Sequence, residues 1–452
     1  MGIKDLLITP VWLGIIYFLA YTLRPVFTDN RIKAYFIPGL SVKVVGALAV
    51  GFIYQFYYGG GKPSGDTFNY FKEAQVIFNA FLENPKAGIQ LLLANGEVNP
   101  EIYEYANRIY WFDAPTEYFV IKLIALFSLF TGHTYTAVAT IFAAISFSGI
   151  WAMYRSFYKL FPALHKEFAI AMLFVPSVFF WGSGILKDTI TLGALGWATW
   201  GIVRVFFERK GIVIGALVLF LSLYTIYSIK IYIVLCFLPA AILWVFLANV
   251  ERIKSVALRI LILPFVLVIG GLLGYYAMVK VGEDNNRYSL DKVSETAEIT
   301  ARYLTYMGET QGGSVYTLGD DYDFSPTGML RKFPLAVNVT LFRPYLWEAH
   351  NVVMLLSALE SFATLLLTLW VIYQAGVMNL FRYTLARPII GFCLLFAIAF
   401  SFAVGISTYN FGSLVRYKIP MFPFYLAGLF ILRYLAQRKV KLKKRPKAVL
   451  NP

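Results

Sequence analysis

Apolar runs of roughly 20 residues recur along this chain of 452 residues, and they constrain its fold more than any other feature. Most are close to the ~20 residues that an α-helix needs to cross ~30 Å of hydrocarbon. They lie near 6–23, 38–58, 117–131, 134–154, 168–186, 189–206, 212–228, 231–249, 258–279, 351–375, 389–408 and 418–436. None shows the period-two alternation of a membrane barrel strand. The runs predict an all-α, polytopic membrane protein with about 11 to 13 spanning helices.

The composition agrees with a membrane environment. Hydrophobic residues make up 59% of the chain and charged residues only 14%, which excludes an ordinary soluble globule. The first apolar run begins right after Met1–Asp5 and carries no small-residue cleavage site. We therefore expect an uncleaved N-terminal anchor and not a signal peptide.

The formal net charge of +15 comes from basic clusters in the segments between apolar runs. This distribution is typical of membrane topology and does not indicate nucleic-acid binding. Basic clusters lie at Arg24/Arg31/Lys33, Arg155/Lys159/Lys166, Arg204/Arg209/Lys210, Arg252/Lys254/Arg259, Arg382/Arg387 and 438–447. From 155 onward, two apolar runs separate each cluster from the next, which predicts that these clusters and the C-terminal tail are cytoplasmic. Three apolar runs lie between Lys33 and Arg155, and three spans would place these two basic clusters on opposite sides of the membrane. One of the three runs is therefore expected not to cross the membrane as an ordinary span. The segment 117–131 is short and carries Lys122, which favours a re-entrant or tilted helix there.

Several common chemistries lack support in the sequence. Cys236 and Cys393 both lie within apolar runs, where cysteine behaves as a small hydrophobe. His133, His165 and His350 have no metal-ligand spacing. The chain has no Walker, Rossmann or HExxH motif, and no internal repeat of the kind found in transporters. We therefore expect neither a zinc site nor nucleotide hydrolysis.

Two long polar segments divide the chain into five expected parts. These are the N-terminal spans 1–58, a first external loop 59–116, a central bundle 117–279, a second external loop or lid 280–349, and the C-terminal spans with the basic tail 350–452. In the first loop, Phe68–Phe81 and Glu101–Tyr110 have the pattern of amphipathic interfacial helices. The positive-inside assignment places the second loop outside the membrane, and the simplest topology places the first loop outside as well.

Asp66 follows the second apolar run within a glycine-rich segment. Glycines at 59, 60, 61 and 65, together with Pro63, predict an irregular backbone that a ligand can approach closely. Aromatic residues, including Tyr70, surround the acid. The alternative is structural, because Gly-Asp-Thr before Phe68–Phe81 also suits a helix N-cap at Asp66.

Other charged residues are expected at the same outer face. Charges near membrane depth are costly and usually face a cavity or a partner, so each is a functional candidate. They are Lys187, Asp188, Arg343, Glu348, Glu360, Arg416 and Lys418. The alternatives are a snorkelling lysine with a capping aspartate, headgroup anchors near the last span, and structural ion pairing between Arg343 and the glutamates. The acidic stretch Gly319–Asp323 fits a loose divalent-cation site or a solvated loop.

With these residues in view, the chain resembles the membrane glycosyltransferases of the GT-C superfamily and, more loosely, bacterial polysaccharide or O-antigen polymerases. The similar pieces are Gly65–Tyr70, Leu126–Gly132, Pro176–Asp188 and Arg416–Pro423. The resemblance implies a helical enzyme of the cytoplasmic membrane. It would transfer a sugar from a polyprenyl-phosphate-linked donor, at the outer face, to a glycan, lipid or protein acceptor.

The resemblance also implies roles for particular residues. The acid of the first external loop, here Asp66, would be the catalytic base or a metal ligand, and Arg416, with Lys418, would hold the donor phosphate. In that family a second acid commonly stands beside this residue, and this chain lacks it, so the sequence leaves open whether a divalent cation is required. A second departure from the family is the extra span that precedes the loop. On chemical grounds Lys187 is a further phosphate ligand, while Asp188, Arg343, Glu348 and Tyr70 support the site. The alternatives are a lipid-linked glycan polymerase or ligase, a flippase, and an envelope-assembly scaffold.

Overall fold

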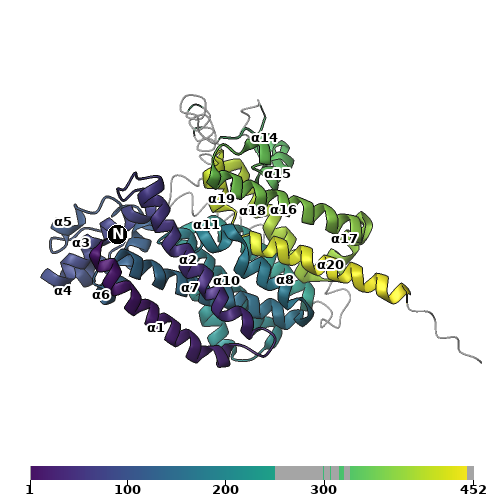
Figure 1. Cartoon of the computed structure of the whole chain (residues 1–452), viewed down its shortest axis with the longest axis horizontal. Helices are drawn as coiled ribbons and strands as arrows, with labels where there is room; N and C mark the ends of the chain where they lie inside the picture. Colours follow the sequence, from purple (N-terminus) through teal and green to yellow (C-terminus); the bar gives the residue numbers. More distant parts are fainter. Residues whose placement is uncertain (1, 250–298, 300–305, 307–314, 320–325, 445–452) are drawn as a thin grey trace, which may run out of the picture. The chain divides into compact units, whose positions relative to one another are not determined.

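The computed structural model describes the chain except for residues 1, 250–298, 300–305, 307–314, 320–325 and 445–452 (Figure 1). The chain divides into two compact units, Met1–Val234 and Leu235–Pro452. The boundary falls inside the expected central bundle 117–279. Each unit is described by itself.

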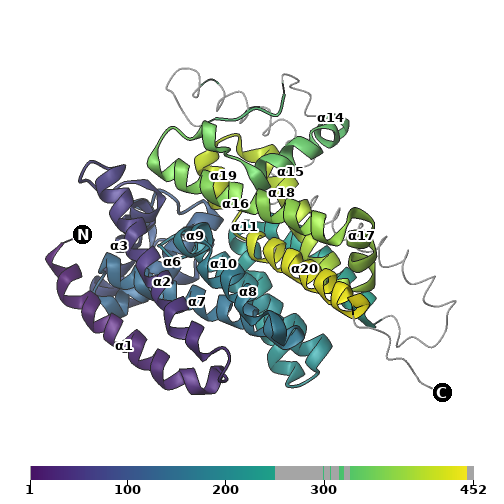
Figure 2. The same cartoon turned by 45° about the vertical axis from the view of Figure 1, so that its right-hand side comes forward.

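The first unit is built on long apolar helices. They are α1 (Ile3–Phe27), α2 (Lys33–Phe52) with the π-helix η1 (Ile53–Tyr57), α7 (Tyr135–Leu160), α10 (Lys187–Ile202) with the π-helix η4 (Val203–Glu208), and the first part of α11 (Ile212–Asn249). In both views α7 lies behind α1 and α2 and beside α10 (Figures 1 and 2). Lys230 has non-helical backbone angles and breaks α11. A broken apolar helix at membrane depth often marks a functional position.

Small residues allow α7 and α10 to approach closely. A Cβ atom added to Gly149 would lie 1.9 Å from the carbonyl oxygen of Gly193, and one added to Gly196 would lie 2.1 Å from the carbonyl oxygen of Gly149. Close backbone contact through glycine is typical of helix pairs in membranes, where dispersion and not the hydrophobic effect holds helices together. The crossing therefore depends on the absence of side chains at these positions.

We expect Gly149→Leu to lower the thermal unfolding temperature of the detergent-solubilised protein markedly. The added side chain must push α7 away from α10, and overpacking typically costs about 1–3 kcal/mol even without a helix shift. Gly14→Leu in α1 is the matched control, because a Cβ at Gly14 meets nothing within 4 Å. Equal unfolding temperatures for the two variants would contradict the packing described here.

Short helices fill the segments between the long ones. They are α3 (Gly65–Glu83), α4 (Pro85–Leu93), α5 (Tyr103–Ala106), α6 (Pro115–Thr131), η2 (Pro162–Leu164), α8 (His165–Ala169), the π-helix η3 (Ile170–Phe174) and α9 (Pro176–Trp181). The expected helix Phe68–Phe81 lies within α3, whereas the expected Glu101–Tyr110 is helical only over α5. The apolar side of α3 is buried against α6 in one hydrophobic core. This part of the chain is thus packed onto the helices and is not an open loop.

The second unit contains the remaining helices. They are the last part of α11, α14 (Pro326–Arg331), α15 (Phe333–Phe342), η6 (Leu346–Glu348), α16 (Val352–Ala375), α17 (Val377–Ala386), α18 (Pro388–Thr408), α19 (Phe411–Tyr417) and α20 (Phe422–Lys444). Figure 2 shows α16, α18 and α20 side by side. Phe237, Phe392, Phe396 and Phe424 form an edge-to-face aromatic core among α11, α18 and α20. Such ring pairs add to the stabilisation that burial gives.

The all-α, polytopic class is confirmed. Seven helices of the described chain are long and apolar enough to span a membrane, or eight if α19 and α20, bent by 65°, form one broken span. The expected number was about 11 to 13, and three features account for the difference. The runs 212–228 and 231–249 form the one helix α11; the runs 117–131 and 168–186 form a 17-residue helix and a series of short helices; and the run 258–279 lies outside the described residues.

Candidate functional site

Asp66 lies in the first turn of α3, directly after the irregular segment that ends α2 and η1. Gly60, Gly61 and Gly65 all have positive φ, as the glycine pattern predicts. Ser64 is the N-cap residue, so the alternative in which Asp66 itself caps the helix is wrong. As the second residue of α3, its partly exposed carboxylate lies near the positive end of the helix dipole.

Tyr54 connects the start of α3 to the segment between α9 and α10. A Cβ atom on Gly65 would lie 2.4 Å from the Tyr54 ring, so the backbone next to Asp66 rests on that ring. The Tyr54 ring also contacts Trp181 edge-on, with centroids 6.4 Å apart. Trp181 ends α9, six residues before Lys187. Through Tyr54 the start of α3 therefore contacts the end of α9.

Lys187 and Asp188 both form ion pairs with other helices. Lys187 pairs with Glu117 at the start of α6, and its ammonium group also donates to Thr116 Oγ1 at 2.9 Å. Asp188, completely buried, pairs with Lys230 at the break in α11. We call Glu117, Lys187, Asp188 and Lys230 the charged cluster. At the N-terminus of α10, one ion pair takes its base from α10 and the other takes its acid from α10. The two pairs together carry no net charge.

Lys43 in α2 contacts the segment that precedes Lys187. Its side chain is 1% exposed, and its Nζ donates to the carbonyl oxygen of Gly182 at 2.6 Å and to Ser146 Oγ at 3.2 Å. Gly182 follows the last residue of α9, where unpaired carbonyl groups attract a cation. Lys43 thus fixes the turn that leads from α9 to Lys187.

In the second unit, Arg343 and Glu348 form the ion pair that the structural alternative expected. Arg343 Nε lies 3.0 Å from Glu348 Oε1, and the guanidinium group also lies over the Phe411 ring, 5.1 Å from its centroid. Lys418 is fully buried and donates to Ser361 Oγ at 3.0 Å, and Ser361 in turn donates to the carbonyl oxygen of Arg343. Arg416 stays partly exposed at the end of α19.

The predicted site residues therefore form two groups. Asp66, Tyr70, Lys187 and Asp188 lie in the first unit, where Tyr70 is buried with its ring edge against Trp111, 5.3 Å between centroids. Arg343, Glu348, Arg416 and Lys418 lie in the second unit. Within the second group, Arg343 and Glu348 are joined directly, and Lys418 is joined to Arg343 through Ser361. The acidic stretch expected as a loose cation site falls largely outside the described residues, and the described part of the chain holds no group of three or more potential metal ligands.

Lys230 and Lys43 were missed by the sequence analysis. Both were visible as lysines within or between apolar runs, which is a recognised signal of functional or structural importance in membranes. Their partners could not be predicted, because Asp188 and Gly182 are distant in sequence and meet them only through helix packing. Glu117 begins the short apolar run 117–131, and its pairing with Lys187 likewise depends on helix packing.

His133 connects α6 to α7 and has an unusually low pKa. Its ring stacks on Phe71, with centroids 3.9 Å apart, and Nδ1 lies 3.0 Å from Ser128 Oγ. Burial, and then the charge of Lys4, lower the pKa of His133 to about 4 from 6.5. The imidazole is therefore neutral at physiological pH, which excludes it as a phosphate-binding cation there.

This shift predicts a pH-dependent contribution to stability. Between pH 6.5 and about 4 the unfolded chain binds a proton at His133 that the folded chain does not bind, so the free energy of unfolding decreases as the pH falls through this window. We expect unfolding temperatures measured from pH 7.5 to 4.5 to fall more steeply for the natural protein than for His133→Asn. Asparagine tolerates the positive φ of 53° at this position. Parallel curves would contradict the prediction, and His350→Asn, at an exposed position, is the control.

The fold and its buried charges define the chain as a multi-pass helical membrane protein. Comparison of the chain with protein-family models, with curated proteins and with solved structures found no match.

Proposed function

We propose that this protein is an integral membrane glycosyltransferase that transfers a sugar from a polyprenyl-phosphate-linked donor to an acceptor. The observation that carries the proposal is the position of Asp66. Its partly exposed carboxylate stands in the first turn of α3, at the end of the spanning helix α2–η1 and above a glycine-rich backbone. A base for a membrane-borne substrate needs these properties: access from the interface, a fixed backbone, and an apolar anchor beside it.

The reaction assigns a role to each charge. The acceptor hydroxyl gives its proton to Asp66, and its oxygen forms a bond to the anomeric carbon of the donor. The bond from that carbon to the phosphate oxygen breaks, and its electron pair leaves with the polyprenyl phosphate. This single displacement inverts the anomeric configuration. For the departing phosphate the resemblance implies Arg416, which is partly exposed at the end of α19, and guanidinium groups bind phosphate oxygens in bidentate fashion.

Lys418 and Lys187 have smaller parts in this proposal than the sequence analysis gave them. Lys418 is fully buried with its ammonium group on Ser361, and Lys187 is paired with Glu117. We assign both to positioning: Lys418 links α16 to the residues after α19, and Lys187 links α10 to α6. The proposed setting is the cytoplasmic membrane, with the C-terminal tail inside and Asp66 at the outer face.

The direct test is turnover by the purified protein in nanodiscs. Polyprenyl-phosphate-linked sugars and candidate acceptors are supplied, and release of polyprenyl phosphate is followed by chromatography, with the anomeric configuration of the product read by NMR. We expect release that depends on an acceptor, and an inverted product. If the protein instead moves intact lipid-linked sugars across liposome membranes without consuming them, the flippase alternative is correct and the proposal is wrong.

A further inference from the structure

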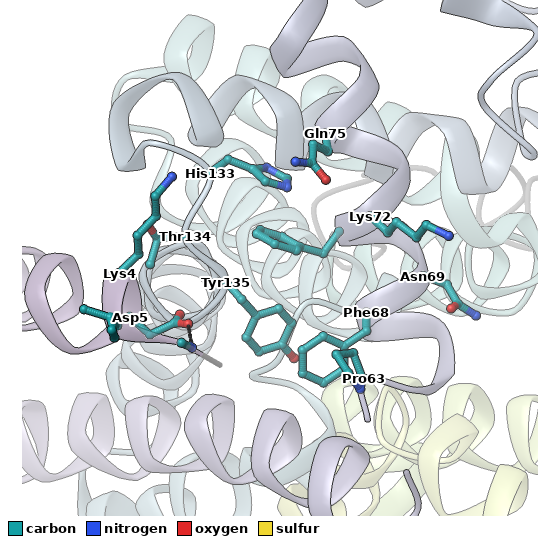
Figure 3. Close-up of a pocket in the computed structure, with 13 residues that line it drawn as sticks. Lys4, Asp5, Pro63, Phe68, Asn69, Lys72, Gln75, His133, Thr134 and Tyr135 are labelled. Atoms are coloured by element: carbon teal, nitrogen blue, oxygen red, sulfur yellow. Dashed lines mark hydrogen bonds between the residues drawn. The ribbon is translucent and has the colours of Figure 1, made fainter. Parts of the chain in front are cut away.

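A cavity of about 580 Å³ opens beside α3, and His133 lies in its lining (Figure 3). Its volume lies within the roughly 300–1,000 Å³ typical of small-molecule sites. Its walls come from the start of α1, one side of α3, and the connection between α6 and α7. Figure 3 shows Lys4 and Thr134 on one side of the cavity and Lys72 and Asn69 on the other. All of these elements belong to the first unit.

A buried hydroxyl group in the wall of this cavity has no hydrogen-bond partner among the described residues. Thr134 is the N-cap residue of α7, yet its side chain makes no capping bond. Asp5 of α1 caps the helix in its place, since its carboxylate accepts from the backbone N–H of Thr136 at 3.0 Å and from Thr136 Oγ1 at 2.7 Å. Thr134 is only 2% exposed, and its Oγ1 has no partner among the described residues. A buried hydroxyl of this kind is costly unless a ligand satisfies it.

The charged groups around the cavity favour an anion. Lys4 and Lys72 are both exposed at its rim, and neither forms an ion pair with a described residue. The carboxylate of Asp5, the one acidic side chain of the lining, is occupied by Thr136 and by the backbone N–H of Gly2 at 2.7 Å. The N-terminal end of α7 adds a partial positive charge.

The remaining lining suits a sugar. Asn69 and Gln75 present amide groups, which both donate to and accept from hydroxyl groups. Phe68 stacks on Tyr135 with centroids 4.1 Å apart, and these rings form an apolar wall for C–H surfaces. Polar amides around an aromatic wall match the mixed surface of a saccharide better than the uniformly apolar tail of a lipid.

We propose that this cavity is the acceptor subsite of the protein and that it binds an anionic saccharide, one bearing a carboxylate or phosphate group. The assignment as the acceptor subsite rests on the proposed function, whereas the binding of an anionic saccharide does not. Pro63, Phe68 and Asn69 line the cavity and flank Asp66 in the chain, so a saccharide bound there reaches toward the proposed base. Lys4, Lys72 and Thr134 recognise the anionic group, and Asn69 with Gln75 recognise the hydroxyl groups.

The test is equilibrium binding without any donor, with the full chain in phosphatidylcholine nanodiscs. The probes are paired oligosaccharides that differ only in charge: uronic-acid disaccharides against their carboxyl-reduced forms, and sugar phosphates against the free sugars. The variants are Lys4→Gln/Lys72→Gln, Thr134→Val, and the control Lys33→Gln/Lys166→Gln, which neutralises two exposed lysines elsewhere in the first unit. Unfolding temperatures show whether each variant is folded.

We expect at least one anionic probe to bind about tenfold more tightly than its neutral counterpart, and the Lys4/Lys72 variant to lose about that factor. Thr134→Val should weaken binding severalfold, and the control should bind like the natural protein. Equal affinity for charged and neutral probes, no binding to any probe, or equal competition by inorganic phosphate alone would overturn the inference. So would binding of phosphatidylglycerol that the Lys4/Lys72 variant abolishes, since the site would then hold a lipid headgroup. Binding by a protein that shows no sugar transfer would leave the binding of an anionic saccharide standing and refute the proposed function, together with the assignment of the cavity as its acceptor subsite.

Discussion

Asp66→Asn is expected to reduce the rate of sugar transfer by about 10²–10⁴, the usual contribution of a general base. Asparagine keeps the size of the side chain but cannot take a proton from the acceptor hydroxyl. The N-cap of α3 is Ser64, so the substitution leaves the cap of the helix unchanged. The measurement is the initial rate of polyprenyl-phosphate release by purified protein at matched concentration. Binding of the anionic saccharide should be retained, because Asp66 does not line the cavity.

The matched control is Asp113→Asn, which removes an exposed carboxylate from the same stretch between the second and third long helices. We expect that variant to keep its full rate. Asp66→Glu should recover part of the activity lost in Asp66→Asn, because the base is present but displaced. An undiminished rate in Asp66→Asn would show that Asp66 is not the base, and equal losses in Asp66→Asn and Asp113→Asn would point to a general effect of negative charge.

Asp188→Ala is expected to destabilise the protein by about 3–5 kcal/mol, the typical cost of leaving a buried charge without its partner. Asp188 is completely buried and pairs with Lys230 at the break in α11. Lys230→Met should cost less, because the first turn of α10 still stabilises the carboxylate of Asp188. The measurement is the free energy of unfolding by denaturant titration in mixed micelles.

The double variant Asp188→Leu/Lys230→Met separates the ion pair from the packing around it. Since two apolar side chains of similar size often replace a buried ion pair without loss, this variant should recover most of the stability lost in Asp188→Ala. Additive losses in the double variant would contradict the pairing. Lys159→Met removes an ion pair that is more exposed, with Glu208, and should cost at most about 1 kcal/mol.

Much of the local structure could be predicted because it depends on near neighbours in the chain. The glycine pattern predicted an irregular backbone, in which Gly60, Gly61 and Gly65 have positive φ, and the amphipathic pattern predicted the helix Phe68–Phe81 that lies within α3. The Arg343–Glu348 pair was one of the alternatives that the sequence left open for these residues, and only four residues separate its members. In contrast, the apolar pattern predicts two spans, 212–228 and 231–249, where the structure has one helix, α11, broken at Lys230. A lysine in an apolar stretch signals a costly charge, but its effect on the backbone depends on where its partner lies.

The sequence by itself determined the all-α membrane class, the position of Asp66 after a spanning helix, and the residues whose charge is expensive in an apolar environment. These follow from the length and polarity of the runs, because a bilayer acts on each segment in nearly the same way. Only the tertiary structure decided which charges meet. Helix packing pairs Asp188 with Lys230, pairs Lys187 with Glu117, and brings Lys43 into contact with the end of α9. The sequence separations are 42, 70 and 139 residues. The same packing allowed Asp5 to replace Thr134 as the cap of α7, which created the cavity's free hydroxyl group.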